Sequence, residues 1–194
     1  GAGFIGSHIA KHLVEKNHDV IVVDNLSRGR LENLSKIKEQ IEFKKMDILD
    51  FDSLKKVIFN SDGIFHQAAL TSVPESFTQK EKYHNVNVKG TENIFKLAKE
   101  FGKKVVYASS SSIYGNTTTI PIQENFEKNP INPYGITKLD DEKLAKKFHD
   151  LGLSVIGLRY FNVYGIGQTN DYAGVITKFI DQINLNKSPI IFGD

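Results

Sequence analysis

A glycine-rich stretch at the start of the chain, GAGFIGSH (residues 1–8), limits the fold more than any other part of the sequence. Gly1, Gly3 and Gly6 satisfy the pattern G-x-G-x-x-G, in which a strand turns sharply into a helix and bare backbone can approach a pyrophosphate. A Cβ would block both the turn and the approach. The next helix would direct its free N–H groups and positive dipole end at the phosphates. The pattern alone is weak evidence, so the rest of the chain has to support it.

Short β-branched runs alternate with longer segments of helical spacing. We expect strands at residues 19–24, 41–47, 63–69, 104–110 and 153–161. Between them, Ile94, Leu97, Ala98 and Phe101 recur at the spacing of one helix face. Strands separated by helices of this length predict right-handed crossovers and a parallel sheet that is covered on both faces. The fold class is therefore α/β, a Rossmann-type doubly wound sheet.

Composition excludes several kinds of site. The 194 residues carry a net charge of +2, with the basic residues scattered, so neither nucleic acid nor a membrane surface is expected as a partner. There is no cysteine, which excludes disulfides, thiolate metal sites and a cysteine nucleophile. No apolar run approaches the roughly 18 residues of a membrane span. We expect a cytoplasmic protein with no metal.

Asp24 is the first independent support for a nucleotide site. It ends a predicted strand 18 residues after Gly6, where a dinucleotide fold places an acid that binds the adenine ribose. A carboxylate there repels a 2′-phosphate, which favours NAD over NADP. Arg28 and Arg30 follow closely and could pair with such a phosphate, so both cofactors stay open on this evidence alone.

Tyr134 and Lys138, in NPYGITK, lie four residues apart and therefore on one helix face. A tyrosine with a pKa near 10 is a poor base at neutral pH, and a nearby ammonium lowers that pKa. Hydroxyls of Ser110 to Ser112 come 22 to 24 residues before Tyr134, at the end of a predicted strand. Serine, tyrosine and lysine beside a nicotinamide would form a hydride-transfer site.

The ordered set of motifs resembles the extended short-chain dehydrogenase/reductases of the NAD-dependent epimerase/dehydratase family. It is most similar to the UDP-glucose and UDP-N-acetylglucosamine 4-epimerases. The motifs are GFIGSH, DNLSRGR, MDILD, HQAALTSVPES, NVKGT, SSSSIYG, NPYGITK and RYFNVYG. Members of this family begin with a short strand before the glycine loop and continue into a sugar-nucleotide lobe. The resemblance thus implies an NAD-binding domain at 1–162 without its first strand, and the start of a smaller substrate lobe at 163–194.

The resemblance also implies roles for particular residues. Ser110, Tyr134 and Lys138 would be catalytic. NAD would contact Gly3, Phe4, Ile5, Gly6, Asp24, Asn25, Ser27, Asp47, Ile48, Gln67, Ala68, Ala69, Asn87, Tyr134, Lys138 and Tyr160. The UDP-sugar would contact Ser110, Ser111, Ser112, Tyr134, Asn162, Gly174 and Val175.

Three functional classes stay open. The resemblance favours NAD-dependent 4-epimerisation of a UDP-hexose through a transient 4-keto sugar, by a homodimer when the protein is full length. A 4,6-dehydratase, decarboxylase or reductase on nucleotide sugars is the alternative. Such dehydratases and decarboxylases place an acid where this chain has Ser111 and Ser112. A non-catalytic NAD-binding sensor is disfavoured because Ser110, Tyr134 and Lys138 are all present. The sequence does not decide whether the sugar is glucose or N-acetylglucosamine, and it does not fix the base of the nucleotide.

Other features have ordinary structural interpretations. His8 and His12 share the spacing of a metal pair, but no third ligand is evident, so both read as helix residues. His66 reads as a packed residue near the cofactor. Residues 139–147 read as a solvated helix face. Four phenylalanines are expected in the core: Phe43, Phe51, Phe59 and Phe65.

Overall fold

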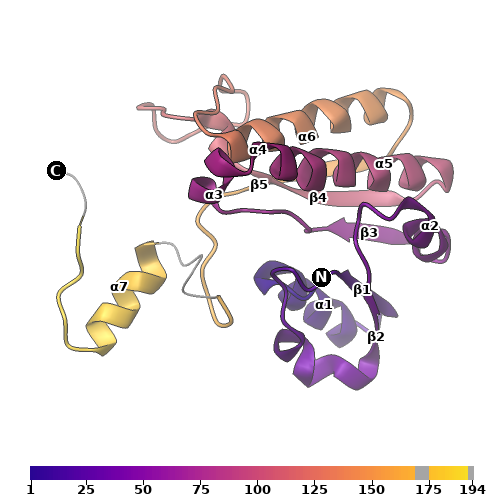
Figure 1. Ribbon diagram of the computed structural model, residues 1–194, viewed down its shortest axis with the longest axis horizontal. Helices are drawn as coiled ribbons and strands as arrows, with labels where there is room; N and C mark the ends of the chain where they lie inside the picture. Colours follow the sequence, from indigo (N-terminus) through magenta and orange to yellow (C-terminus); the bar gives the residue numbers. More distant parts are fainter. Residues whose placement is uncertain (169–174, 192–194) are drawn as a thin grey trace. The chain divides into compact units, whose positions relative to one another are not determined.

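The computed structural model of the chain describes residues 1–168 and 175–191 (Figure 1). The chain divides into two compact units, Gly1–Tyr160 and Phe161–Asp194. The division falls two residues before the boundary expected after residue 162. The functional roles expected for the two parts stay predictions.

All strands of the larger unit run parallel to their neighbours, as the sequence predicts. The strands are β1 (Val20–Asp24), β2 (Ile41–Lys45), β3 (Gly63–His66), β4 (Lys104–Ser110) and β5 (Val155–Tyr160). β1 pairs with β2 in one sheet, and β3, β4 and β5 form a second sheet in that order. Asp24 lies opposite Lys45, and Ser110 lies opposite Tyr160. The carboxyl ends of the paired strands therefore share an edge in each sheet, where ligands bind in open α/β sheets.

Helices connect the strands. They are α1 (Phe4–Glu15), α2 (Phe51–Phe59), α3 (Val73–Thr78), α4 (Lys80–Tyr83), α5 (Gly90–Glu100), α6 (Pro133–Asp150) and α7 (Val175–Asn184). Tighter 3₁₀ segments occur at η1 (Leu31–Gln40) and η3 (Ser111–Tyr114), and a π-helical segment, η2 (His84–Lys89), joins α4 to α5. The α/β class with parallel sheets, expected of a Rossmann-type fold, is confirmed.

Each sheet has its own core. α4, α5 and α6 lie along one side of the β3–β4–β5 sheet (Figure 1). There, Phe95 of α5 packs edge-on against Tyr107 of β4, with ring centroids 5.4 Å apart, and against Phe148 of α6, 5.8 Å apart. A second cluster, around Val22 and Leu34, joins β1 to α1 and η1. These two cores hold the carboxyl ends of both sheets in place.

Two sequence expectations about burial are wrong in part. Phe43 and Phe51 are partly buried against the two cores, but Phe59 and Phe65 are 61% and 48% exposed. Phe59 ends α2, and its ring only meets the edge of Phe101. Phe65 is on short β3. The segment 139–147 is not solvated throughout, because Asp141 is fully buried.

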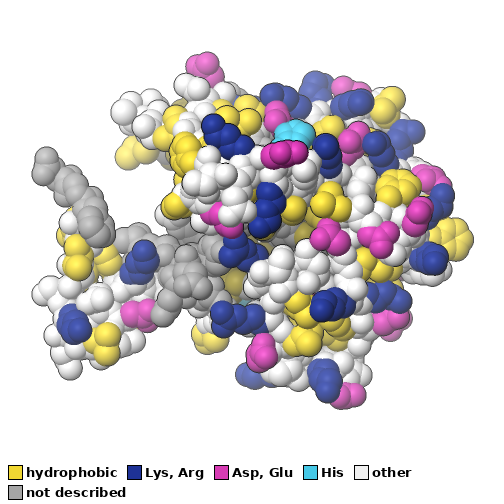
Figure 2. Space-filling model, viewed as in Figure 1, with side chains coloured by type: hydrophobic (Ala, Val, Ile, Leu, Met, Phe, Trp, Pro, Cys, Tyr) yellow, Lys and Arg dark blue, Asp and Glu magenta, His cyan; other side chains and the backbone are white. Residues whose placement is uncertain are grey.

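Charge is mixed over the surface, which fits the near-neutral composition. On the face seen in Figure 2, basic and acidic side chains are interspersed over the larger unit. Within residues 1–168 and 175–191, no helix has the length and apolar character needed to cross a bilayer.

Candidate active site

The glycine loop leads directly into α1. Gly3 precedes the helix, no side chain caps it, and its first turn holds no acidic residue. A Cβ on Gly6 would lie 2.7 Å from the carbonyl oxygen of Gly1, so only glycine lets the helix start pack on the loop. A Cβ on Gly3 would meet nothing within 4 Å. An uncapped helix start beside open space suits a bound pyrophosphate, as the motif predicts.

Asp24 joins the glycine loop to the end of β1. Its Oδ2 accepts from the backbone N–H of Ala2 and from the Gly1 nitrogen, and its Oδ1 accepts from the N–H of Leu26, each at 2.8 Å. A Cβ on Gly29 would lie 2.7 Å from both carboxylate oxygens. Since each oxygen can accept two hydrogen bonds, Oδ1 retains acceptor capacity for a ribose hydroxyl.

The other residues expected at the adenosine also follow β1 and β2. Asn25 and Ser27 are exposed, and Asn25 donates from Nδ2 to Asp47 at 2.8 Å. Asp47 also accepts from the N–H of Leu49. Ile48 packs partly buried against the larger core. The structure thus brings these residues to one edge, near Asp24.

Gln67, Ala68 and Ala69 come directly after β3. Both polar atoms of the Gln67 amide are buried and form no well-aligned hydrogen bond within the described part of the chain, although the amide interacts with the hydroxyl of Tyr160. A buried polar group without a partner is costly and is often completed by a ligand or water. The position of Gln67 therefore fits the expected passage to the nicotinamide.

The side-chain amide of Asn87 forms hydrogen bonds within the chain. It lies in η2, is fully buried, and donates from Nδ2 to the carbonyl of Leu70 and to Thr137 Oγ1, both at 3.0 Å. Its Oδ1 accepts from the N–H of Leu70 at 2.8 Å. The amide thus ties η2 to α6 and to the segment after β3, and its predicted contact with the nicotinamide ribose stays a prediction.

α6 brings Tyr134 and Lys138 to the end of β4. The helix begins at Pro133, and Asn132 caps it by accepting from the N–H of Gly135 at 2.8 Å. The side chain of Lys138 is 3% exposed. Its Nζ donates to the carbonyl of Ala108 and to Asp141 Oδ2, both at 3.1 Å.

The serine segment meets the same helix. Ser110 ends β4, is 8% exposed, and accepts on Oγ from the N–H of Ser112 at 3.1 Å. A Cβ on Gly135 would lie 2.7 Å from the carbonyl oxygen of Ser112, so the first turn of α6 packs directly on η3. Ser111 and Ser112 form the start of η3. The two segments that hold the predicted catalytic residues therefore meet at one place.

Tyr160 lies opposite Ser110 at the end of β5, and burial raises the pKa of its hydroxyl. Asn162 is exposed and belongs to the smaller unit. Val175 is the first residue of α7. Gly174 lies outside the described residues.

Asp141 is a residue that the sequence analysis missed. It is fully buried and contacts Lys138 on the next turn of α6, three residues earlier. Burial raises the pKa of Asp141, although the ammonium of Lys138 opposes that shift. An acid at i+3 from the lysine was the signal, because the two share one helix face.

His66 is buried at the end of β3, with Nε2 at 2.8 Å from Thr91 Oγ1. Burial, together with the charge of Lys138, lowers the pKa of His66 to about 3. The ring is therefore neutral at physiological pH. Across residues 1–168 and 175–191, no three His, Asp or Glu residues are grouped as metal ligands.

Comparison with known proteins decides the family. The model of the NAD-dependent epimerase/dehydratase family matches residues 1–194. The chain belongs to that family. The description of the family names NAD as the cofactor, and the glycine loop, Asp24 and Gln67 described above suit a dinucleotide.

Solved structures and curated relatives agree on the fold. A UDP-N-acetylglucosamine 4-epimerase from Methanobrevibacter ruminantium, in complex with UDP-N-acetylmuramic acid, is 39% identical with a TM-score of 0.92, covering 100% of this chain and 63% of its own. A UDP-glucose 4-epimerase from Thermotoga maritima, solved with UDP-glucose, is 34% identical with a TM-score of 0.91. The match covers 100% of this chain and 64% of the Thermotoga chain. A UDP-N-acetyl-alpha-D-glucosaminuronate decarboxylase from Bacillus cytotoxicus is 34% identical, covering 100% and 62%. The chain thus spans less than two thirds of the length of these relatives.

Proposed function

We propose that the whole protein is an NAD-dependent 4-epimerase of UDP-hexoses. The similar solved structures from Methanobrevibacter ruminantium and Thermotoga maritima are both 4-epimerases of UDP-sugars. The glucose and N-acetylglucosamine forms are both candidate substrates. A cytoplasmic location and a homodimer stay predictions.

Each member of the catalytic set has a chemical part. The residues of the glycine loop, Asp24 and Gln67 would hold NAD, which would supply a reversible acceptor for the hydride at C4 of the sugar. Tyr134 takes the proton of the O4 hydroxyl as general base and later gives it back. The hydroxyl of Ser110 holds the same oxygen. Lys138 lies one helical turn after Tyr134 on the same face of α6, where its ammonium can contact the ribose of the cofactor.

The state of the nearby carboxylates is the observation that carries the proposal. Expelling water from the sugar would need an acid that can give up a proton. Glu142 accepts from Arg159 at 2.8 and 2.9 Å and from Ser109 at 2.7 Å. Burial raises the pKa of Glu142, but these hydrogen bonds outweigh it and hold the pKa below its usual range.

Asp141 is unsuited to acid catalysis on a sugar for a different reason, because burial raises its pKa but also keeps its carboxyl out of reach. It is fully buried and paired with Lys138. Glu142 and Asp141 are thus both engaged with cations. This supports a reaction that moves only a hydride and a proton.

Decarboxylation and dehydration are the alternative reactions. The chain is also similar to the decarboxylase from Bacillus cytotoxicus and to a dTDP-glucose 4,6-dehydratase from Streptomyces venezuelae, which is 28% identical with a TM-score of 0.89. A panel of UDP- and dTDP-sugars, with products separated chromatographically, distinguishes them. We expect interconversion of C4 epimers of UDP-hexoses only. A dehydrated or decarboxylated product from the whole protein would contradict the proposal.

A further inference from the structure

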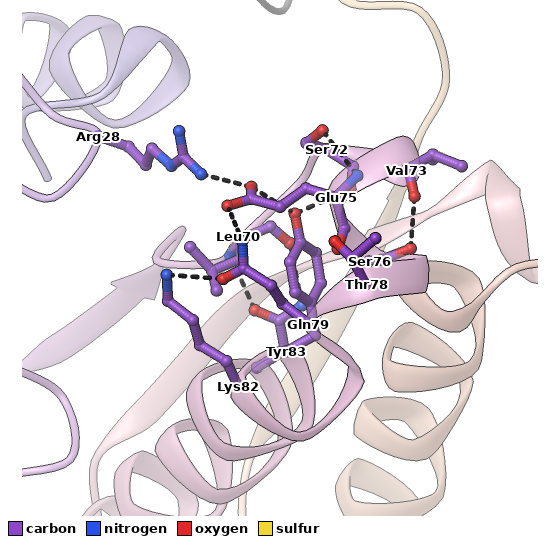
Figure 3. Close-up of polar contacts among 11 residues, drawn as sticks. Arg28, Leu70, Ser72, Val73, Glu75, Ser76, Thr78, Gln79, Lys82 and Tyr83 are labelled. Carbon is purple, nitrogen blue, oxygen red and sulfur yellow. Dashed lines mark hydrogen bonds and ion pairs between the residues drawn. The ribbon is translucent and has the colours of Figure 1, made fainter.

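Arg28 and Glu75 form an ion pair that joins the loop after β1 to helix α3. Arg28 follows β1, in the motif DNLSRGR, and Glu75 lies in the first turn of α3. The Arg28 guanidinium donates from Nη2 to Glu75 Oε2 (Figure 3). The arginine side chain is 42% exposed, whereas that of Glu75 is 20% exposed.

Glu75 is held in place by its own neighbours. Gln79 donates from Nε2 to Glu75 Oε1 at 2.9 Å (Figure 3). The hydroxyl of Tyr83 lies 2.8 Å from the carbonyl of Ser72 and 3.1 Å from Glu75 Oε2, so its proton is shared between the two oxygens. Tyr83 is fully buried, and burial followed by the charge of Glu75 raises its pKa, so the phenol keeps its proton. A carboxylate that is already ordered loses little side-chain freedom when it binds an arginine.

Arg28 stands close to the predicted adenosine site. The next residue, Gly29, packs directly against the carboxylate of Asp24, since a Cβ there would lie 2.7 Å from both oxygens. An arginine beside such an acid is the group that accommodates the 2′-phosphate of NADP. Its planar guanidinium can hold phosphate through two parallel hydrogen bonds.

We infer that Glu75 determines the preference for NAD over NADP, because it engages the guanidinium of Arg28 that would otherwise bind a 2′-phosphate. With the guanidinium of Arg28 paired to Glu75, a 2′-phosphate would face the negative charge of Asp24. The inference rests on the proposed function, since it takes the edge at Asp24 as the ribose site.

The test measures binding, not turnover. Dissociation constants of NAD and NADP are determined calorimetrically for the whole protein freed of bound nucleotide, and for Glu75→Gln. The ratio of NADP to NAD affinity should rise about tenfold in Glu75→Gln, the gain expected from one charge-assisted contact. In the double variant Glu75→Gln with Arg28→Gln, the ratio should return to that of the parent.

Glu81→Gln is the matched control. It removes the same charge from the exposed surface of α4 and should leave the ratio unchanged. An equal ratio in Glu75→Gln and Glu81→Gln would overturn the inference. So would a gain that persists in the double variant, because Arg28 would then not be its source.

Arg28→Gln alone keeps the inference testable if Glu75→Gln fails to fold. This single change removes the cation and leaves Glu75 unpaired, so it should not raise the ratio of NADP to NAD affinity. A rise in that ratio would contradict the inference. A parent protein that binds no NAD would instead contradict the proposed function.

Discussion

At the scale of single residues, Lys138 shows how strongly the site depends on burial. A buried ammonium needs partners, and the carbonyl of Ala108 and the carboxylate of Asp141 supply them. These contacts fix the lysine one helical turn beyond Tyr134.

Tyr134→Phe tests this chemistry. In the whole protein, the variant should bind NAD and UDP-sugar normally but lose at least about a hundredfold in turnover, the usual scale of general acid–base help. Ser110→Ala should cost less, and the double change should be less than additive, because both groups act on one proton. If Tyr134→Phe turned over at the parent rate, the assignment of Ser110, Tyr134 and Lys138 as the catalytic residues would be wrong.

His66 makes the free energy of unfolding depend on pH in the acidic range. Its pKa is about 3 in the folded chain and near 6.5 when unfolded, so the unfolded state binds the extra proton. Stability from His66 is therefore present above pH 6.5 and falls as the pH drops toward 3. Asp141 contributes to the pH dependence of stability with the opposite sign. Its pKa is raised in the folded state, so the folded state binds a proton at a pH where the unfolded state does not, and this contribution stabilises the protein as the pH falls.

His66→Gln separates the two contributions. Relative to the parent, the free energy of unfolding of the variant should improve by up to about 1.4 kcal/mol for each pH unit below 6.5. Urea denaturation at pH 7 and pH 4.5 measures this difference. Parallel losses in both proteins would show that His66 is not the group responsible.

At the scale of elements, the first turn of α6 is the critical junction. Gly135 lets the helix pack on the backbone of Ser112, which places Tyr134 beside the serine segment. Asn132 and Pro133 define where the turn begins. A small displacement here would separate groups that must act together.

Gly135→Ala tests the junction. The added methyl would lie 2.7 Å from the Ser112 carbonyl oxygen, so we expect a loss of about 1–3 kcal/mol in stability together with lower turnover. Gly63→Ala is the control, because its Cβ would lie 3.7 Å from the nearest atom. Similar melting temperatures and activities for the two variants would argue against the junction.

The elements themselves were largely predictable, because buried parallel strands read as β-branched runs with helical spacing between them. Three features were not. The π-helical turn that buries Asn87 has no signal in hydrophobic periodicity. Asp141 was read with the charged run around it, yet tertiary packing buries it against Lys138. The ion pair of Arg28 with Glu75 joins residues 47 positions apart, which spacing rules cannot reach.

At the scale of the whole molecule, the candidate groups lie at the carboxyl ends of parallel strands. Asp24 ends β1, Ser110 ends β4 and Tyr160 ends β5. This arrangement gives one place for a dinucleotide and one for a proton-transfer set. The chain spans less than two thirds of its relatives, and the rest of their length is where further substrate contacts are expected.

The central claim is that the reaction inverts C4 of a UDP-hexose and leaves no net redox change. The most direct measurement supplies UDP-glucose, UDP-galactose and their N-acetyl forms to the whole protein in heavy water with catalytic NAD. Nuclear magnetic resonance should find C4 epimers without deuterium on any sugar carbon. Deuterium at C5 or C6, or NADH formed in proportion to product, would contradict the claim.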